Sequence, residues 1–83
     1  MYYTYLAECA DRTLYCGYTD DVKNREKVHN SGKGAKYTRS RLPVKIVYYE
    51  EFETKSEALK REHAIKKLTR GQKEKLIKNS PAI

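Results

Sequence analysis

The chain has 83 residues, a length that suits one domain with one modest core, so we expect a single domain over residues 1–83. Its 18 lysines and arginines exceed its 11 aspartates and glutamates, and the formal net charge of +7 favours an anionic partner, with a charge that serves only solubility as the equal alternative. No apolar run approaches the ~20 residues of a membrane span, and no signal peptide is recognisable. A membrane protein is therefore excluded, and we expect a cytoplasmic one.

Two strands joined by a tight turn are predicted at the start of the chain. Residues 2–8 and 13–19 are rich in aromatic, β-branched and apolar side chains. Alternate residues of a strand share a face, so pairing of odd with odd residues would place Tyr5 and Tyr15 on one side of the sheet, with Gly17 leaving an open space beside them. A slip of one residue would separate the two tyrosines, and the sequence alone does not fix the register.

The two cysteines of the sequence, Cys9 and Cys16, flank this turn without the spacing of metal ligands. A disulfide between them is open on sequence grounds. With no signal peptide, we expect a reducing compartment in which both thiols act as small packing residues.

A helix is predicted from about Asp21 to His29 or Asn30, because an aspartate offers an N-cap and Gly32 offers a stop. Arg25 and His29 stand four positions apart on one helical face. Arg25 lies within or beside the stripe that should face the sheet. An arginine there needs an anionic partner, which is either a protein carboxylate or a ligand.

Residues 31–43 form a connection rich in glycine, serine and basic side chains, with a short helical turn expected near residues 37–41. No acid occurs in this segment, and Tyr37 is interleaved among the basic residues. We favour phosphate binding slightly over a solvated loop. The candidate substrate-binding residues in this segment are Lys33, Lys36, Arg39 and Arg41.

Residues 44–51 form a third predicted strand, whose nearly continuous apolar run suggests cover on both faces. A capping box, Thr54 to Glu57, then opens a helix over about residues 55–67. Its apolar stripe is marked by Ala58, Leu59, Ile65 and Leu68. Glu62 falls inside this stripe, where a carboxylate is costly unless it is paired or metal-bound. It is either a structural ion pair with Arg25 or a lysine, or a ligand for a divalent cation.

A second capping box at residues 69–72 starts a last helix over roughly residues 70–78, which Leu76 and Ile77 would dock. The predicted fold class is therefore α+β: a small, mainly antiparallel three-stranded sheet flanked by helices, in the order ββαβαα.

These residues, taken in order, resemble the GIY-YIG nuclease superfamily, and in particular its small stand-alone bacterial members. The resemblance covers nearly the whole chain. Tyr3-Thr4-Tyr5 and Tyr15-Cys16-Gly17 stand at the two halves of the name motif, Arg25 and His29 follow at the family's spacing, and residues 58–62 resemble the helix that carries the family's metal-binding glutamate. The first half of the motif keeps only its final tyrosine, and Tyr18 stands where some members have a lysine.

The resemblance implies an endonuclease that uses Mg²⁺ or Mn²⁺ to hydrolyse phosphodiester bonds of DNA, with structured or damaged DNA as a candidate substrate. By resemblance, Glu62 would hold the metal, and Arg25 would stabilise the charge that builds on the phosphate. Tyr15 would orient or deprotonate the attacking water, with His29 favouring the phenolate or taking its proton. Tyr5 would brace these groups by a hydrogen bond, and Gly17 would keep space for the substrate.

Other readings stay open at this point. Singly, Tyr5, Gly17 and His29 are better explained by packing, a bulge or a helix end, whereas together with Arg25 and Glu62 in family order they favour a site. The alternatives are a nucleic-acid-binding module with little activity, or a ribonuclease, since nothing here reads a 2′-hydroxyl. For the whole set we expect a monomer that binds nucleic acid, DNA rather than RNA, and needs no small-molecule cofactor.

Overall fold

The fold is described by a computed structural model over residues 1–80. It is the predicted α+β fold with a three-stranded antiparallel sheet, and the strand order in this sheet is β2-β1-β3. The strands are β1 (Tyr2–Glu8), β2 (Leu14–Thr19) and β3 (Lys45–Phe52). The helices are α1 (Val22–Asn30), the four-residue α2 (Lys36–Arg39), α3 (Lys55–Lys66) and α4 (Arg70–Lys78). None of these helices is long and apolar enough to cross a membrane.

The register of the first hairpin pairs odd with odd residues. Tyr5 lies opposite Gly17, and Ala7 lies opposite Tyr15. The two tyrosines therefore project to the same face of the sheet, as the sequence pattern required for a shared site. Asp21 caps α1 by accepting a hydrogen bond from the Asn24 backbone amide at 3.1 Å, which places the helix directly after β2.

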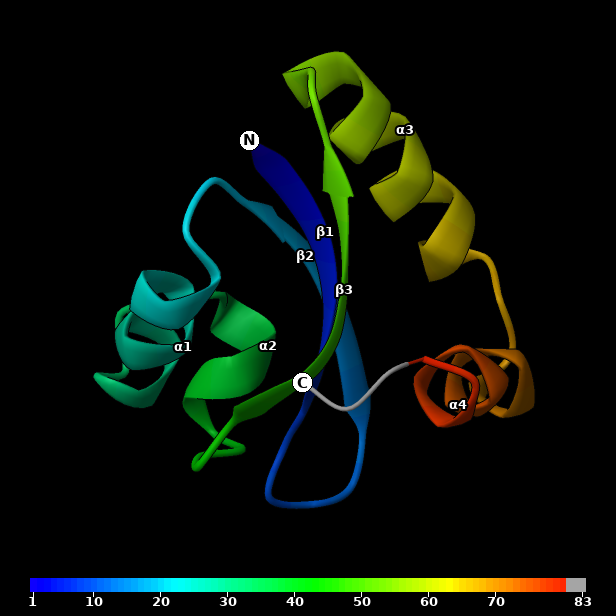
Figure 1. The fold of residues 1–83 in the computed structure, drawn as a ribbon. Coiled ribbons are helices and arrows are strands. Elements are labelled where there is room, and N and C mark those ends of the chain that lie inside the picture. Colours follow the sequence, from blue (N-terminus) through cyan, green and yellow to red (C-terminus); the bar gives the residue numbers. More distant parts are fainter. Residues whose placement is uncertain (81–83) are drawn as a thin grey trace.

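Helices cover both faces of the sheet: α1 and α2 lie on one side of β1, and α3 and α4 on the other (Figure 1). The central strand is consequently buried on both faces, with Tyr5 1% exposed and Leu6 0% exposed. The core beneath α1 and α2 is formed by Tyr5, Ala7, Cys9, Val44 and Ile46. The core beneath α3 and α4 is formed by Leu6, Cys16, Tyr48 and Ile65. The two cysteines are free and buried in different cores, which confirms their packing role.

Strand β3 lies at an edge of the sheet, and its register against β1 shifts between Leu6 and Ala7. The shift sends Ile46 into one core and Tyr48 into the other, because an irregularity of one residue reverses the alternation. The prediction of a strand covered on both faces is therefore correct for these two residues. It is wrong for Tyr49, which is 41% exposed.

The capping boxes predicted at the starts of α3 and α4 are both present. The predicted stripe of α3 needs one correction. Ala58 and Ile65 are fully buried, but Leu59 is 40% exposed. A small rotation of a helix about its axis determines which neighbour of a buried residue is also buried, and the sequence does not set that rotation.

Candidate functional site

A buried chain of hydrogen bonds joins β1, α1 and α2. The Tyr5 hydroxyl lies 2.6 Å from His29 Nε2, and His29 Nδ1 lies 2.9 Å from the Thr38 hydroxyl. Thr38 Oγ1 in turn donates to the Ala35 carbonyl at 2.9 Å. Tyr5 is 1% exposed, and His29 and Thr38 are 0% exposed. These polar groups are thus satisfied by one another rather than by solvent.

Arg25 lies at the outer end of this chain. Its Nε donates to the Tyr5 hydroxyl at 3.5 Å, and the side chain is half-buried. Within residues 1–80, no carboxylate lies within ion-pair distance of the guanidinium. The sequence-based alternative of an ion pair between Glu62 and either Arg25 or a lysine is met by Lys66 and not by Arg25. A half-buried guanidinium without a carboxylate keeps its full positive charge available for an anion.

Tyr15 stands beside this chain as the less buried of the two motif tyrosines. Its ring centroid lies 6.4 Å from that of Tyr5 and 5.6 Å from that of His29. The ring also stacks on Tyr37 of α2, with centroids 5.9 Å apart and an interplanar angle of 22°. The Arg41 guanidinium lies over the Tyr37 ring at 3.9 Å. Tyr15 is therefore held by rings on several sides, while its half-buried position leaves part of it at the surface.

The space beside Gly17 is filled, which corrects the expectation that this glycine leaves a gap for substrate. A Cβ built on Gly17 would lie 2.9 Å from Tyr5 Cε2 and closer still to Cζ and the hydroxyl oxygen. The missing side chain is therefore what allows the Tyr5 ring to reach His29. Gly34 plays the same part on the other side of the histidine, because a Cβ there would overlap His29 Nδ1 and Cα.

Burial keeps the inner members of the chain neutral. It raises the pKa of Tyr5 to about 12, against the opposing effect of the hydrogen bond from Arg25. Burial also lowers the pKa of His29, and the positive charge of Arg25 lowers it further. Both nitrogens of His29 have partners other than Tyr15, so the expected transfer of a Tyr15 proton to His29 has no direct path. Tyr5 and His29 are sealed from substrate and can act only through the groups that they hold.

The basic connection divides into engaged and open side chains. Arg41 pairs with Asp11 at 3.1 Å and donates to the Tyr37 carbonyl at 2.6 Å, so it is held by the protein itself. Lys33, Lys36 and Arg39 are exposed. Three of the four predicted substrate-binding residues of this segment are therefore available to a phosphate backbone, whereas Arg41 supports the Tyr37 ring.

Glu62 belongs to α3, on the opposite face of the sheet from Tyr5. Its carbonyl accepts a weak hydrogen bond from Cys16 Sγ at 3.7 Å, so α3 crosses β2 next to Tyr15 but on the other face. The Glu62 side chain is 19% exposed and pairs with Lys66 at 3.4 Å. The structure therefore brings Tyr5, Tyr15, Arg25 and His29 together and leaves Glu62 across the edge strand from them.

No group of three or more His, Cys, Asp or Glu side chains that could hold a metal occurs within residues 1–80. Mg²⁺, however, usually keeps several waters and is held by one or two carboxylates together with substrate phosphates. One partly exposed carboxylate, whose one ion pair among the described residues is with an exposed lysine, fits that mode of binding. It does not fit a closed cage of protein ligands.

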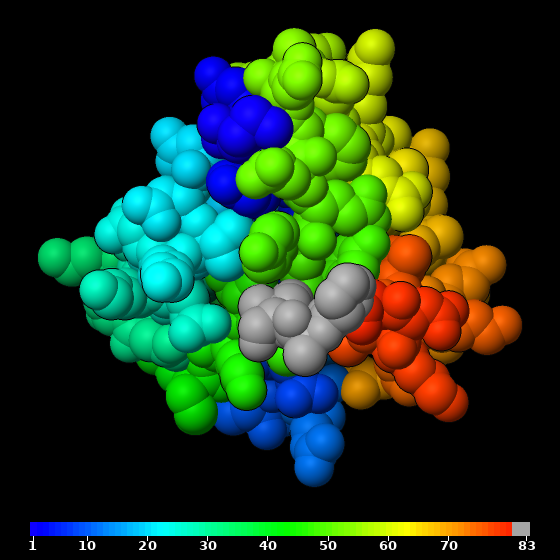
Figure 2. Space-filling model, in the orientation of Figure 1, coloured from blue at the N-terminus to red at the C-terminus, as the bar shows by residue number. Residues whose placement is uncertain are grey.

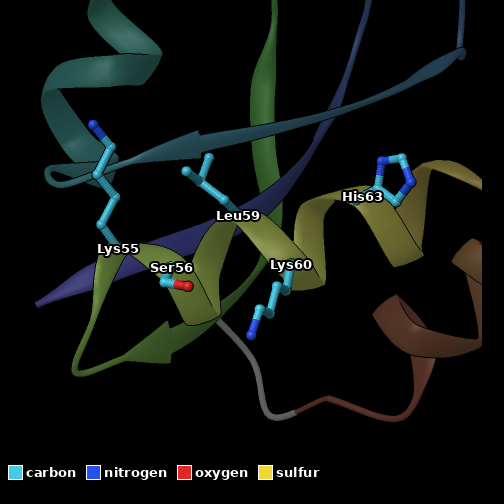
Figure 3. Close-up of a pocket in the computed structure, with 5 residues that line it drawn as sticks. All are labelled: Lys55, Ser56, Leu59, Lys60 and His63. Carbon is cyan, nitrogen blue, oxygen red and sulfur yellow. The ribbon is translucent and has the colours of Figure 1, made fainter.

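The outer side of α3 carries a shallow hollow of about 570 Å³ that the sequence reasoning did not single out (Figure 3). It is lined by Lys55, Ser56, Leu59, Lys60 and His63. Lys55 Nζ also lies 5.7 Å from the ring centroid of Tyr18 in β2. This hollow adds positive charge to the α3 side, and the space-filling view places α3 along the flank of the sheet, away from α1 (Figure 2).

The sequence reasoning missed Thr38, Tyr37 and Gly34 as members of the site. Tyr37 was noticed only as an aromatic among basic residues, and Thr38 gave no signal beyond lying in a short helical turn. Their importance comes from α2 packing on α1, which brings Thr38 to His29 and Tyr37 to Tyr15.

Comparisons with known proteins agree with this geometry. The family model of the GIY-YIG catalytic domain matches residues 1–75. A UPF0213 protein of Haloquadratum walsbyi is 51% identical over 82 residues, covering 99% of this chain and 92% of the relative. A UPF0213 protein of Clostridium perfringens is 57% identical over 77 residues, covering 93% of this chain and 83% of the relative. The solution NMR structure of a UPF0213 protein from Bacillus halodurans matches with a TM-score of 0.59 at 48% identity, over 94% of this chain and 84% of that one.

Proposed function

The chain belongs to the GIY-YIG catalytic-domain family and, within it, to the small UPF0213 proteins, and from that premise we propose that it is a divalent-metal-dependent endonuclease that hydrolyses phosphodiester bonds of DNA. The observation that carries the proposal is Arg25. It is a half-buried guanidinium with no carboxylate partner within the described residues. It is bonded to the buried Tyr5, whose ring centroid lies 6.4 Å from that of the half-buried Tyr15.

Hydrolysis of a phosphodiester needs stabilisation of the charge on the phosphoryl oxygens, a positioned water and help for the leaving oxygen. Arg25 supplies the first requirement. Its Nε is committed to Tyr5, which leaves the other guanidinium nitrogens to bind two phosphate oxygens side by side.

Tyr15 supplies the second requirement. It is the motif phenol that is not sealed in the core, and the stacking of Tyr37 and the edge of His29 fix its ring plane. A hydroxyl held in this way orients a water for attack on the phosphorus. Tyr5 and His29 support the site from below, because their burial keeps them from touching the substrate.

Glu62 would hold the metal at the other side of the edge strand β2. A bound Mg²⁺ or Mn²⁺ would act there as a Lewis acid that stabilises charge on the phosphate and the leaving oxygen. The side chain of Lys66 is half exposed, so it can turn away from Glu62 without disturbing the core.

The exposed residues Lys33, Lys36 and Arg39 extend the positive surface from α1 along the connection to α2. They would hold the phosphate backbone on either side of the scissile bond, without reading its sequence. DNA is the favoured substrate, and branched or nicked DNA are the forms to try first.

The test is cleavage of branched, nicked and plain duplex DNA in Mg²⁺ or Mn²⁺, with an RNA of the same sequence beside them. We expect cleavage that EDTA abolishes. Tyr15→Phe, Arg25→Ala and Glu62→Ala should each lower the rate by about 100-fold or more, the scale of losing one stabilising group. Arg70→Ala serves as the matched control, because it removes one positive charge from an exposed site. Equal losses in this control, or cleavage indifferent to all three active-site changes, would refute the proposal.

A second candidate function is nucleic-acid binding without turnover. The position of Glu62 on the other face of the sheet from Tyr5 and Arg25 favours it. In that case the protein would cleave no DNA or RNA with any divalent metal. It would still bind nucleic acid through Lys33, Lys36 and Arg39, and the affinity would fall steeply as the salt concentration rises.

A further inference from the structure

We propose that Thr38 is a positioning residue that sets the direction of a one-way hydrogen-bond chain from Arg25 to the Ala35 carbonyl, and that this chain anchors Arg25 without cancelling its charge. The chain passes through Tyr5 and His29, and its links are 3.5, 2.6, 2.9 and 2.9 Å long. The direction follows from the two ends of the chain, because one end can only donate a hydrogen bond and the other can only accept one.

The first end is Arg25, which has N–H donors and no acceptor. Its Nε therefore donates to the Tyr5 oxygen, and the Tyr5 proton must go elsewhere. Within residues 1–80, His29 Nε2 is the only acceptor at hydrogen-bond distance from the Tyr5 hydroxyl. Because Tyr5 is 1% exposed, solvent does not offer an alternative. Nε2 must consequently be the nitrogen without a proton.

The second end is the Ala35 carbonyl, which has no proton to give. It accepts the single hydroxyl proton of Thr38 at 2.9 Å. The Thr38 oxygen is then left with lone pairs only, so it accepts the Nδ1 proton of His29. Both ends thus select the same state: a neutral His29 that carries its proton on Nδ1. The reverse direction would leave the buried Tyr5 proton without an acceptor, which is a costly arrangement.

This arrangement matters because Arg25 is held by a neutral group and not by a carboxylate. Arg61, on the other face of the sheet, is held by both oxygens of Glu50, at 2.9 and 3.1 Å, which neutralise it. Arg25 is held instead by a phenol whose own proton is given to a histidine, and such donation makes the phenol oxygen a better acceptor. The guanidinium is therefore fixed in place by a neutral group and keeps its whole charge for an anionic ligand.

The inference about Arg25 and its ligand rests on the proposed function, but the direction of the chain does not. The first measurement is therefore long-range ¹H–¹⁵N correlation NMR of the folded, ¹⁵N-labelled protein, which distinguishes the two histidine tautomers. We expect His29 with its proton on Nδ1. His63, the other histidine of the sequence and an exposed one, is the internal control and should show the Nε2–H form usual in solvent. A His29 with its proton on Nε2 would overturn the proposal, with or without nuclease activity.

The second measurement compares Thr38→Val with Thr38→Ser. Valine keeps the shape and removes the acceptor of the Nδ1 proton, whereas serine keeps the hydroxyl. We expect Thr38→Val to shift the tautomer toward Nε2–H and to speed hydrogen exchange at Arg25 Nε–H by about tenfold, the change for an anchor weakened by one ordinary hydrogen bond. Thr38→Ser should behave as the wild type. If the valine variant keeps both the wild-type tautomer and the wild-type exchange, Thr38 does not set the direction.

The third measurement separates this proposal from the proposed function. Binding of a short DNA duplex without metal is followed against salt concentration, and loss of one phosphate contact lowers the slope of log K against log[salt] by about 0.9. We expect that decrease in Arg25→Gln, a smaller decrease in Thr38→Val, and none in Thr38→Ser. Suppose that the protein shows the Nδ1–H tautomer and a protected Arg25 Nε–H and yet neither binds nor cuts DNA. That result would refute the nuclease and establish the direction of the hydrogen-bond chain. If Thr38→Val does not fold, the wild-type tautomer and the serine variant still decide the direction.

Discussion

The two faces of the sheet are built on different principles although they share the strand β1. Beneath α1 and α2, Tyr5 joins a buried chain of polar groups in which each atom has one assigned role. Beneath α3 and α4, Leu6 joins an apolar core with Cys16 and Ile65. Alternation along one strand therefore supplies both a site and a scaffold.

The two cores should therefore tolerate different kinds of amino-acid substitution. An apolar core depends on volume and shape, and swaps that conserve volume cost little. A buried polar chain depends also on direction, because the loss of one partner leaves the next one unsatisfied. Similar substitutions should thus have unequal effects on the two sides, and the following comparisons test that difference.

The largest effect is expected from Gly17→Ala. Its Cβ would collide with the Tyr5 ring and hydroxyl, which are pressed against His29, so either the strand or the ring must move. Overpacking of this kind and loss of the Tyr5–His29 bond together should lower the free energy of unfolding by about 2–4 kcal/mol. The matched control is Gly71→Ala on α4, where a Cβ meets nothing within 4 Å. That change should raise stability by about 0.5–1 kcal/mol, since alanine favours the helix.

Urea unfolding of the two alanine variants measures both effects. A Gly17→Ala protein as stable as the wild type would mean that Tyr5 has room to move, and the distinction between the two faces would lose its main support. A destabilised Gly71→Ala would indicate that α4 makes contacts beyond those described.

A smaller effect is expected from removing one phenol hydroxyl on each face. Tyr5→Phe leaves the lone pair of His29 and the Nε–H of Arg25 without partners in a buried setting, which should cost about 1–3 kcal/mol. Tyr48→Phe removes a hydroxyl that donates to Glu50, and Glu50 keeps its two bonds from Arg61. We therefore expect a loss of about 1 kcal/mol or less for Tyr48→Phe.

The activities should differ more than the stabilities. Releasing Arg25 in Tyr5→Phe should lower DNA cleavage, whereas Tyr48→Phe should cleave as the wild type does. Rates measured well below the unfolding transition of each variant separate the two effects. Equal activity in the two variants would show that the anchor of Arg25 does not contribute to the reaction.

The elements of the fold could be predicted from the sequence because each has a local cause. The capping residues Asp21, Thr54 and Thr69 mark helix starts by hydrogen bonds within three residues, and the predicted strands follow from side-chain composition. Odd-to-odd pairing of Tyr5 with Gly17 was one of two registers that the sequence left open. The structure has this register, in which the Tyr5 ring occupies the space that a Cβ on Gly17 would take.

The parts of the site that could not be predicted depend on which face of the sheet each helix covers. Periodicity places Glu62 on the inner side of α3, but it does not state that α3 and α1 lie on opposite faces. For the same reason, the sequence could not show that His29 meets Thr38 rather than Tyr15. The similarity to a family locates functional residues along the chain, whereas their contacts arise from packing between distant segments.

The smallest expected effect is the pH dependence that His29 gives to the free energy of unfolding. The groups that face the His29 ring are Tyr5 from β1, Tyr15 from β2, Thr38 from α2 and, through its charge, Arg25 of its own helix. Only Arg25 is charged at neutral pH, and together with burial it lowers the pKa of His29 in the folded protein below the value near 6.5 of an unfolded chain. Between these two pKa values the unfolded chain binds a proton that the folded protein excludes. Stability should therefore be complete above about pH 6.5 and should fall as the pH decreases toward the folded pKa, by at most about 1.4 kcal/mol per pH unit.

Urea midpoints between pH 8 and pH 5 measure this decline, and two variants assign it. His29→Gln should flatten the profile, because glutamine does not titrate, and His63→Gln at an exposed position is the matched control. The apolar core described under α3 and α4 contains no histidine. A decline that survives in His29→Gln would place the titrating group outside the buried chain.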